Sequence, residues 1–293
     1  MRALTWAAVV AVFLLMTIGN IVSATGSGLA CPDWPLCHGR LIPPLKPDVL
    51  IEYSHRLTAL VTTILLLATI IATIRRPGSS AMRRVGIGLL ILIVVQIALG
   101  AVTVLLRLPH VISTAHLVTA LLILGGLVLL VSTDRSGSVV GAATPQVARL
   151  ARAGLAVLLL QLALGGYVRH SGAGLACPDV PLCTGDWLPG HWLGLVHWTH
   201  RWLGVLLLGL FIHLAIVSRG TPLAGATSIA AALAILQVAL GVATVLLRLD
   251  PATRALHAAV GYSLWATLVW VTARAVGVAG TPAPRTIGVA HAS

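Results

Sequence analysis

Four histidines of this chain lie within long apolar stretches: His55, His116, His200 and His257. An ionisable side chain in such a stretch is costly unless it has a partner, and neutral imidazole is an axial ligand of haem iron. Each histidine follows the expected entry of the chain into a membrane by a turn or two, so all four should lie at one depth. Two histidines on facing helices can clamp one porphyrin. The first two and the last two therefore predict one haem site in each half of the chain.

A carboxylate accompanies the first pair. Glu52, the only glutamate in the chain, precedes His55 by three residues, so the two side chains share a helix face. Such a group can act as a general base or stabilise developing positive charge. Histidine stands in its place before His200, at His197. We predict that Glu52 is catalytic in the first half and that the second half holds a fixed electron-transfer haem. The alternative for Glu52 is a solvated charge at the membrane interface.

Arginines near the histidines suit the two carboxylates that such a porphyrin carries. Arg56 and Arg201 directly follow a histidine, and Arg107 and Arg248 end apolar stretches on the same expected side of the membrane. We expect Arg56 and Arg107 to bind the first haem. We expect Arg201 and Arg248 to bind the second. The alternative for Arg107 and Arg248 is that they reach to the lipid headgroups.

The composition places these residues in a membrane. With 58% apolar and 9% charged residues, and a mean hydropathy of +1.01, the 293-residue chain differs from a water-soluble domain. A helix needs about 20 apolar residues to cross the bilayer. Eight stretches of this length are predicted to be spanning helices: 4–24, 53–74, 85–106, 112–132, 148–168, 194–217, 226–247 and 254–274. They are too long, and lack the alternation, for the strands of a barrel.

The chain also repeats itself. Three segments of the first half match three of the second: 26–37 with 172–183, 54–57 with 199–202, and 96–108 with 237–249. The repeat predicts two tandem, pseudo-symmetric four-helix bundles, an N-terminal half (1–140) and a C-terminal half (141–293). Bundle interiors are where cofactors are held by facing helices. The repeat also indicates that the first stretch is a retained helix rather than a cleaved signal peptide.

Basic residues predict the orientation. With a cytoplasmic N-terminus, eleven of the nineteen Lys and Arg residues fall at the inner ends of the helices, Arg76 among them. We expect a multi-pass protein of the cell membrane with both termini in the cytoplasm and the repeated loops outside. The net charge of +12 is explained by this topology and by attraction to anionic lipids of the bilayer, and no nucleic-acid partner is indicated.

All four cysteines lie in the two repeated loops, Cys31 with Cys37 and Cys177 with Cys183. Each pair encloses five residues, two of them prolines. An oxidising outer compartment favours a structural disulfide in each loop. Redox-active dithiols are the alternative, and zinc is disfavoured because no histidine pattern accompanies the cysteines.

Taken together, these features resemble the haem A synthase family, membrane enzymes of the bacterial and mitochondrial cytochrome oxidase assembly pathway. The resemblance covers the chain to about residue 275: eight spans in two halves, the segment Glu52-x-x-His55-Arg56, the three later histidines and both cysteine pairs. It implies that the chain converts haem O to haem A. In that reaction the methyl group at porphyrin position C8 is oxidised to a formyl group through successive hydroxylations.

The resemblance also implies a division of labour between the halves. His55 and His116 would surround the substrate haem, with Glu52 catalytic, while His200 and His257 would ligate a haem b cofactor. It further implies a homo-oligomer that cooperates with haem O synthase.

The resemblance does not decide whether the cysteines are structural or redox-active. In the family the first-loop cysteines are linked to activity, whereas many members lack the second pair. The presence of both pairs here favours a shared structural role and leaves a redox role for Cys31 and Cys37 in doubt.

Two other functions use the same residues differently. A di-haem b-type cytochrome that only transfers electrons would use the four histidines without needing Glu52. A disulfide-exchanging membrane oxidoreductase would depend on the cysteines and bind no haem.

Overall fold

The computed structural model describes residues 2–75, 80–133 and 143–279. Over these residues the chain forms eight α-helices and one 3-10 turn: α1 (Arg2–Ala24), α2 (Pro47–Arg75), α3 (Ser80–Leu105), α4 (His110–Thr133), α5 (Pro145–His170), η1 (Ala173–Leu175), α6 (Trp192–Val217), α7 (Ala224–Leu246) and α8 (Pro251–Ala279). Each α-helix is long and apolar enough to cross a membrane. The predicted all-α fold of a multi-pass membrane protein is confirmed.

All eight helices begin earlier than the apolar pattern predicts, by two to six residues. Three of them, α2 at Pro47, α5 at Pro145 and α8 at Pro251, begin at a proline, which suits a first helical turn because its missing N–H needs no partner there. Asp250 stabilises the start of α8 by accepting a hydrogen bond from the backbone N–H of Thr253 at 3.0 Å. These polar first turns place residues such as Arg254 inside a helix and not in a loop.

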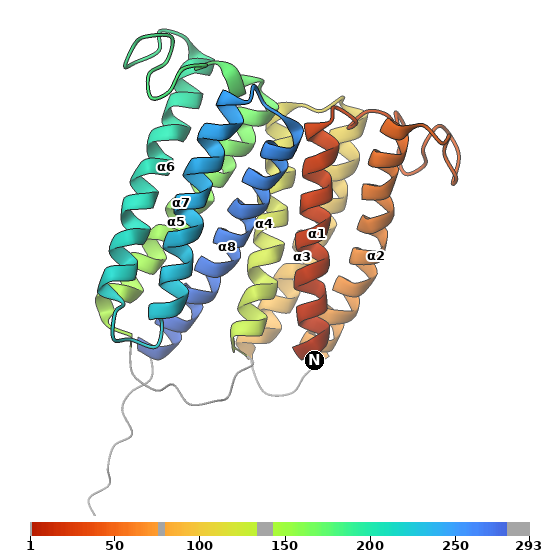
Figure 1. Ribbon diagram of the computed structural model, residues 1–293. Helices are drawn as coiled ribbons and strands as arrows, with labels where there is room; N and C mark the ends of the chain where they lie inside the picture. Colours follow the sequence, from red (N-terminus) through yellow and green to blue (C-terminus); the bar gives the residue numbers. More distant parts are fainter. Residues whose placement is uncertain (1, 76–79, 134–142, 280–293) are drawn as a thin grey trace, which may run out of the picture.

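The two halves lie side by side (Figure 1). The first half is α1 to α4 and the second is α5 to α8, and α1 and α4 of the first half pack against α8 of the second. The Nε1–H group of Trp265 in α8 donates to the carbonyl of Leu121 in α4 at 2.7 Å. The ring of Phe13 in α1 meets Tyr262 in α8 edge-on. The two-bundle pseudo-symmetry stays a prediction, and both its boundary at 140–141 and Arg76 lie outside the described residues.

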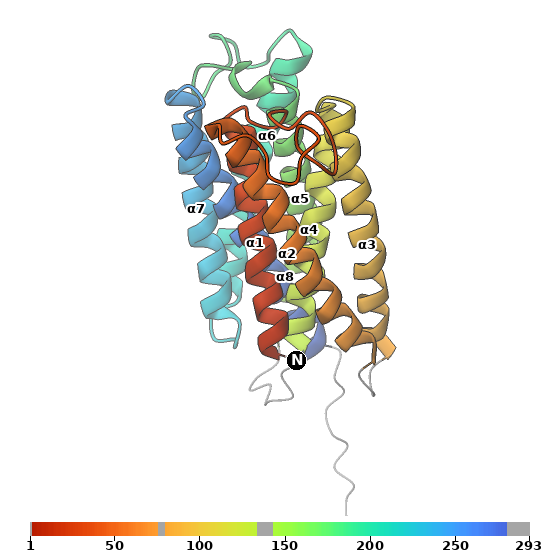
Figure 2. The ribbon, with the colours of Figure 1, turned by 90° about the vertical axis from the view of Figure 1, so that its right-hand side faces the viewer.

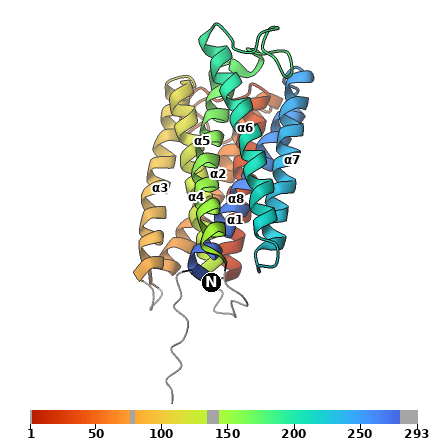
Figure 3. The same ribbon diagram turned by 90° about the vertical axis from the view of Figure 1, so that its left-hand side faces the viewer.

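Both cysteine loops lie at the end of the molecule opposite the N-terminus, which we call the loop end (Figures 2 and 3). Residues 25–46 connect α1 to α2, and residues 171–191, which include η1, connect α5 to α6. Each loop is closed by a disulfide as predicted, Cys31 with Cys37 and Cys177 with Cys183.

Candidate functional site

The four histidines lie on the even-numbered helices, about two turns from the loop end: His55 on α2, His116 on α4, His200 on α6 and His257 on α8. Each side chain is partly accessible. Each Nδ1 atom is buried and makes no hydrogen bond of ordinary geometry among the described residues, although a backbone carbonyl of the preceding helix lies near each ring. Four ionisable rings in membrane-spanning helices mark a candidate ligand site, because such side chains are costly in a membrane unless they have a partner.

A glycine on the preceding helix faces each of these rings. The pairs are Gly19 with His55, Gly100 with His116, Gly165 with His200 and Gly241 with His257. A Cβ atom added to Gly165 would lie 2.7 Å from the Cε1 atom of its histidine, and one added to Gly241 would lie 3.2 Å away. The rings of His55 and His200 therefore occupy space that only glycine leaves free, whereas those of His116 and His257 would have to move by a few tenths of an ångström. The histidine pattern did not predict these glycines, although Gly100 and Gly241 occupy matched positions in the repeat.

Glutamines of the preceding helix contact three of the histidines, two at the imidazole ring and one at the backbone carbonyl. The side-chain nitrogens of Gln96 and Gln237, at matched positions of the repeat, lie 3.3 Å from Nε2 of His116 and His257. In α5, Gln161 donates instead to the backbone carbonyl of His200 at 2.8 Å. Equivalent histidines of α4 and α8 are thus oriented in the same way, which was not foreseen from the sequence.

The second-half histidines face each other across a cavity of about 340 Å³ that both of them line. The centroids of the His200 and His257 rings are 6.5 Å apart. Two imidazole–metal bonds of about 2 Å each, added to the distances from ring centres to nitrogens, span roughly 6 Å. The pair therefore fits the two axial positions of one haem iron. We call this space the second-half cavity.

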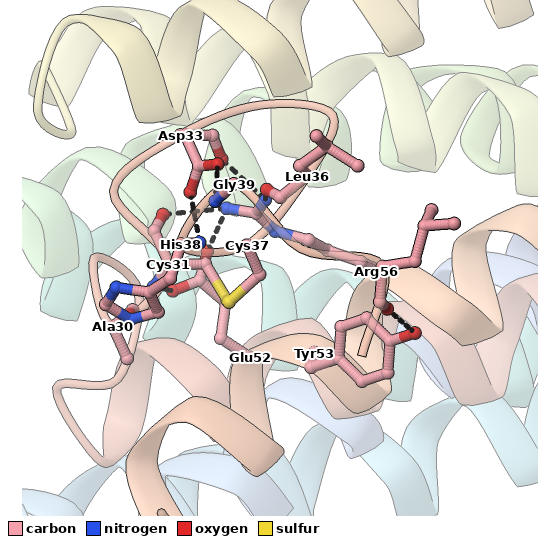
Figure 4. The surroundings of a disulfide bond; sticks show 11 residues. Ala30, Cys31, Asp33, Leu36, Cys37, His38, Gly39, Glu52, Tyr53 and Arg56 are labelled. Carbon is pink, nitrogen blue, oxygen red and sulfur yellow. Dashed lines mark hydrogen bonds and ion pairs between the residues drawn. A yellow bond between two sulfur atoms is a disulfide. The ribbon is translucent and has the colours of Figure 1, made fainter. Parts of the chain in front are cut away.

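The side chain of Glu52, a residue of α2, reaches the first cysteine loop (Figure 4). It is only 3% exposed: Oε1 accepts from Arg56 at 2.5 Å, and Oε2 accepts from the backbone N–H of Cys31 at 2.7 Å. Arg56 also donates to the carbonyls of Cys31, Asp33 and Leu36 at 2.6–2.8 Å. The alternative of a solvated interfacial charge is wrong, because Glu52 is a buried ion-pair partner that fastens the disulfide loop to α2.

The second half builds the same attachment without the carboxylate. His197, which is buried, takes the place of Glu52: its Nε2 lies 3.2 Å from Nε of Arg201, and its Nδ1 lies 3.4 Å from the backbone nitrogen of Cys177. Arg201 donates to the carbonyls of Cys177, Asp179 and Leu182. The charge of Glu52 is therefore not required to attach a loop of this kind.

The predicted porphyrin-binding arginines have different surroundings. Arg56 and Arg201 donate to loop carbonyls, and Arg201 also lines the second-half cavity. Arg107 and Arg248 lie exposed at the turns after α3 and α7, with positive φ angles of 57° and 53°. Their roles in binding a porphyrin stay predictions.

Asp33 fixes the conformation of the first cysteine loop. Its carboxylate accepts hydrogen bonds from the backbone N–H groups of His38 at 2.6 Å and Gly39 at 2.7 Å. These bonds, chiefly the one from Gly39, lower the pKa of Asp33 below its usual value of 3.8, and the positive charge of Arg56 acts in the same direction.

The chain is similar to known proteins over most of its length. Residues 2–50 and 45–269 match the model of a family described as cytochrome oxidase assembly protein. The chain is 29% identical over 266 residues to a haem A synthase of Bacillus licheniformis, covering 85% of this chain and 87% of the relative. It is 29% identical over 288 residues to one of Symbiobacterium thermophilum (92% and 94%). It is 32% identical over 250 residues to one of Shouchella clausii (80% and 83%).

Proposed function

Because the chain belongs to the cytochrome oxidase assembly protein family, we propose that it is a haem A synthase, which oxidises the C8 methyl group of haem O to a formyl group through successive hydroxylations. Haem O would bind between His55 and His116 in the first half, and haem b between His200 and His257 in the second. The halves 1–140 and 141–293 would thus have separate duties, catalysis and electron transfer. Relatives matched over most of their length carry the same name.

The observation that carries this proposal is the facing pair of the second half. Two partly accessible imidazoles that line one cavity, with ring centroids 6.5 Å apart and no described carboxylate paired with either, suit a neutral bis-histidine site better than a packing contact. Haem b bound there would supply one-electron transfer. In the first half the same glycine contacts seat His55 and His116, which supports a second porphyrin site.

Glu52 is proposed to be the catalytic group of the first half. It lies one helical turn from His55, and its orientation is held by Arg56 and by the backbone of Cys31. Each carboxylate oxygen retains lone pairs besides the one used in these contacts. It can therefore accept a proton from a substrate hydroxyl group or stabilise positive charge developing at the methyl carbon.

A di-haem cytochrome that only transfers electrons is the second candidate. The matched glycine and glutamine contacts around the histidines favour it, because they would serve two fixed haems equally well. Glu52 argues against the cytochrome. The second half attaches its loop without a carboxylate, so a protein that only transfers electrons would not need one in the first half.

The test is to express the full chain with haem O synthase in a host that makes no haem A, and to identify the extracted pigments by mass spectrometry. We expect haem B together with haem O derivatives in which oxygen has replaced methyl hydrogens. Haem B with unmodified haem O would support the cytochrome. A folded, colourless protein would contradict both candidates.

We further propose the topology and partners that the family resemblance implies. Both termini would face the cytoplasm and the disulfide loops would face outside, which suits the two disulfides. The chain would form a homo-oligomer and receive haem O from haem O synthase. Labelling of single introduced cysteines at the two ends by a membrane-impermeant reagent tests the topology, because only the outer end should react in intact cells.

A further inference from the structure

Two arginines of the second half reach towards the end of α1. Arg169, in the last turn of α5, donates from Nε to the hydroxyl of Ser23 at 2.9 Å and from Nη2 to the carbonyl of Asn20 at 3.0 Å. Arg254, in the first turn of α8, donates from Nη1 to the carbonyl of Ala24 at 3.2 Å. Both guanidinium groups are partly buried, and both line the second-half cavity.

Neither cation has an acidic partner in the part of the chain that the structure describes. Among the described residues, the ion pair between Arg56 and Glu52 is the only one, so no described carboxylate neutralises Arg169 or Arg254. Carbonyl and hydroxyl contacts satisfy some of the five N–H donors of a guanidinium but leave its charge uncompensated. Two guanidinium groups without a carboxylate partner on one wall of the cavity therefore favour an anionic ligand.

Position along the helices relates these cations to the iron ligands. Arg254 precedes His257 by three residues, so the two share a face of α8, with Arg254 one turn nearer the loop end. Arg169 follows Gly165, the glycine that contacts His200, by four residues on α5. Arg254 thus lies about one turn nearer the loop end than His257, and Arg169 about one turn nearer it than the glycine that contacts His200.

We propose that Arg169 and Arg254 bind the two carboxylates of the second-half haem, whose carboxylate-bearing edge faces the loop end. This assignment rests on the proposed function. It differs from the expectation for Arg248, which does not line the cavity. It adds to the expectation for Arg201, whose hydrogen bonds go to His197 and to the second cysteine loop.

The first half lacks this pair of cations. Serine stands at both matched positions, Ser23 for Arg169 and Ser113 for Arg254. A permanently bound cofactor benefits from two charge-assisted contacts, whereas a substrate that must leave as product does not. The difference agrees with a resident haem in the second half and an exchanging one in the first.

The test compares haem b with its dimethyl ester, in which both carboxylates are blocked. The full chain in a His116→Ala background is titrated with each porphyrin, and the low-spin bis-histidine spectrum reports binding at the second half. We expect the parent protein to bind haem b about tenfold or more tightly than the ester. In Arg169→Gln and Arg254→Gln that ratio should fall towards one, and Arg254→Lys should give an intermediate value.

Arg219→Gln is the matched control, since it removes an exposed arginine beyond the far end of α6 and should leave the ratio at the parent value. If a glutamine variant unfolds without haem, it is loaded with haem b during expression, part of the sample is exchanged into the ester, and the ratio is taken from the two dissociation rates. Lower thermal stability with an unchanged ratio would show that the arginines only tie α1 to the second half, and would overturn the proposal. Failure of the parent to bind haem b at all would instead contradict the proposed function.

Discussion

Glu52 and His197 show how one residue can distinguish two otherwise similar sites. Both occupy the position three residues before a histidine ligand candidate, and both contact a loop cysteine nitrogen and an arginine. A neutral imidazole accepts at only one nitrogen, whereas a carboxylate accepts at both oxygens and carries charge. Attaching the loop, which either residue can do, is therefore separable from acid–base chemistry, for which Glu52 offers a charged carboxylate.

Replacing Glu52 by histidine, the residue at the matched position of the second half, separates the attachment of the loop from the chemistry of the carboxylate. In Glu52→His we expect a folded protein that retains haem, with formation of oxidised haem O products reduced at least about 100-fold, the usual scale for losing a general base. Pigment mass spectrometry and the haem spectrum measure the two effects. Product formation at the wild-type level would show that the carboxylate is structural.

The Asp33 carboxylate predicts a pH dependence of the first loop. Because folding lowers its pKa, its contribution is complete above the unfolded value of 3.8 and is lost as pH falls through the lower folded value. Hydrogen-exchange protection factors of the His38 and Gly39 amides should be constant from neutral pH down to about 4 and decrease below it. Asp33→Asn should reduce protection already at neutral pH. The exposed Asp48→Asn, at the start of α2, is the control and should leave both amides protected.

Pairs of neighbouring helices set the positions of the rings. In each half an odd-numbered helix supplies a glycine and the next helix supplies the histidine that fills the space. The sequence predicted the histidines because polar residues in apolar stretches are conspicuous. It did not predict the glycines, the role of Gln161, or the contacts of Arg56 with its loop, because these depend on helix rotation and on loop conformation, which a hydrophobic pattern does not specify.

Gly165→Ala should disturb this seating. The added Cβ would lie 2.7 Å from Cε1 of His200, so the ring or α5 must move. We expect haem b affinity to fall about tenfold or more, with a weakened low-spin spectrum. Gly209→Ala is the matched control on α6: nothing lies within 4 Å of its added Cβ, and the change should stabilise the helix by about 0.5–1 kcal/mol. Equal spectra for the two variants would contradict the assignment.

At the scale of the whole molecule, the halves are joined by buried contacts that the repeat did not reveal. The bond from Trp265 to the carbonyl of Leu121 links α8 to α4 inside the core. Eight spans and two loop disulfides could be predicted from composition and cysteine spacing. The packing of α1 and α4 against α8 could not, because the repeat gives the content of each half but not the surface by which they meet.

Trp265→Phe tests that contact between the halves. Losing the hydrogen bond should lower the free energy of unfolding by roughly 1 kcal/mol and reduce the thermal midpoint, while the haem spectrum is retained. Trp192→Phe, at an exposed position with 66% of its surface accessible, is the control. If both substitutions leave the midpoint unchanged, the bond does not stabilise the assembly of the halves.

The contact between Arg169 and Ser23 joins equivalent positions of the two copies, since each lies three residues before its matched segment, 172–183 or 26–37. A change at either position therefore alters a contact that both halves share. Exchanging the two residues, Ser23→Arg with Arg169→Ser, should keep a serine–arginine contact between α1 and α5 while moving the cation from the second half to the first.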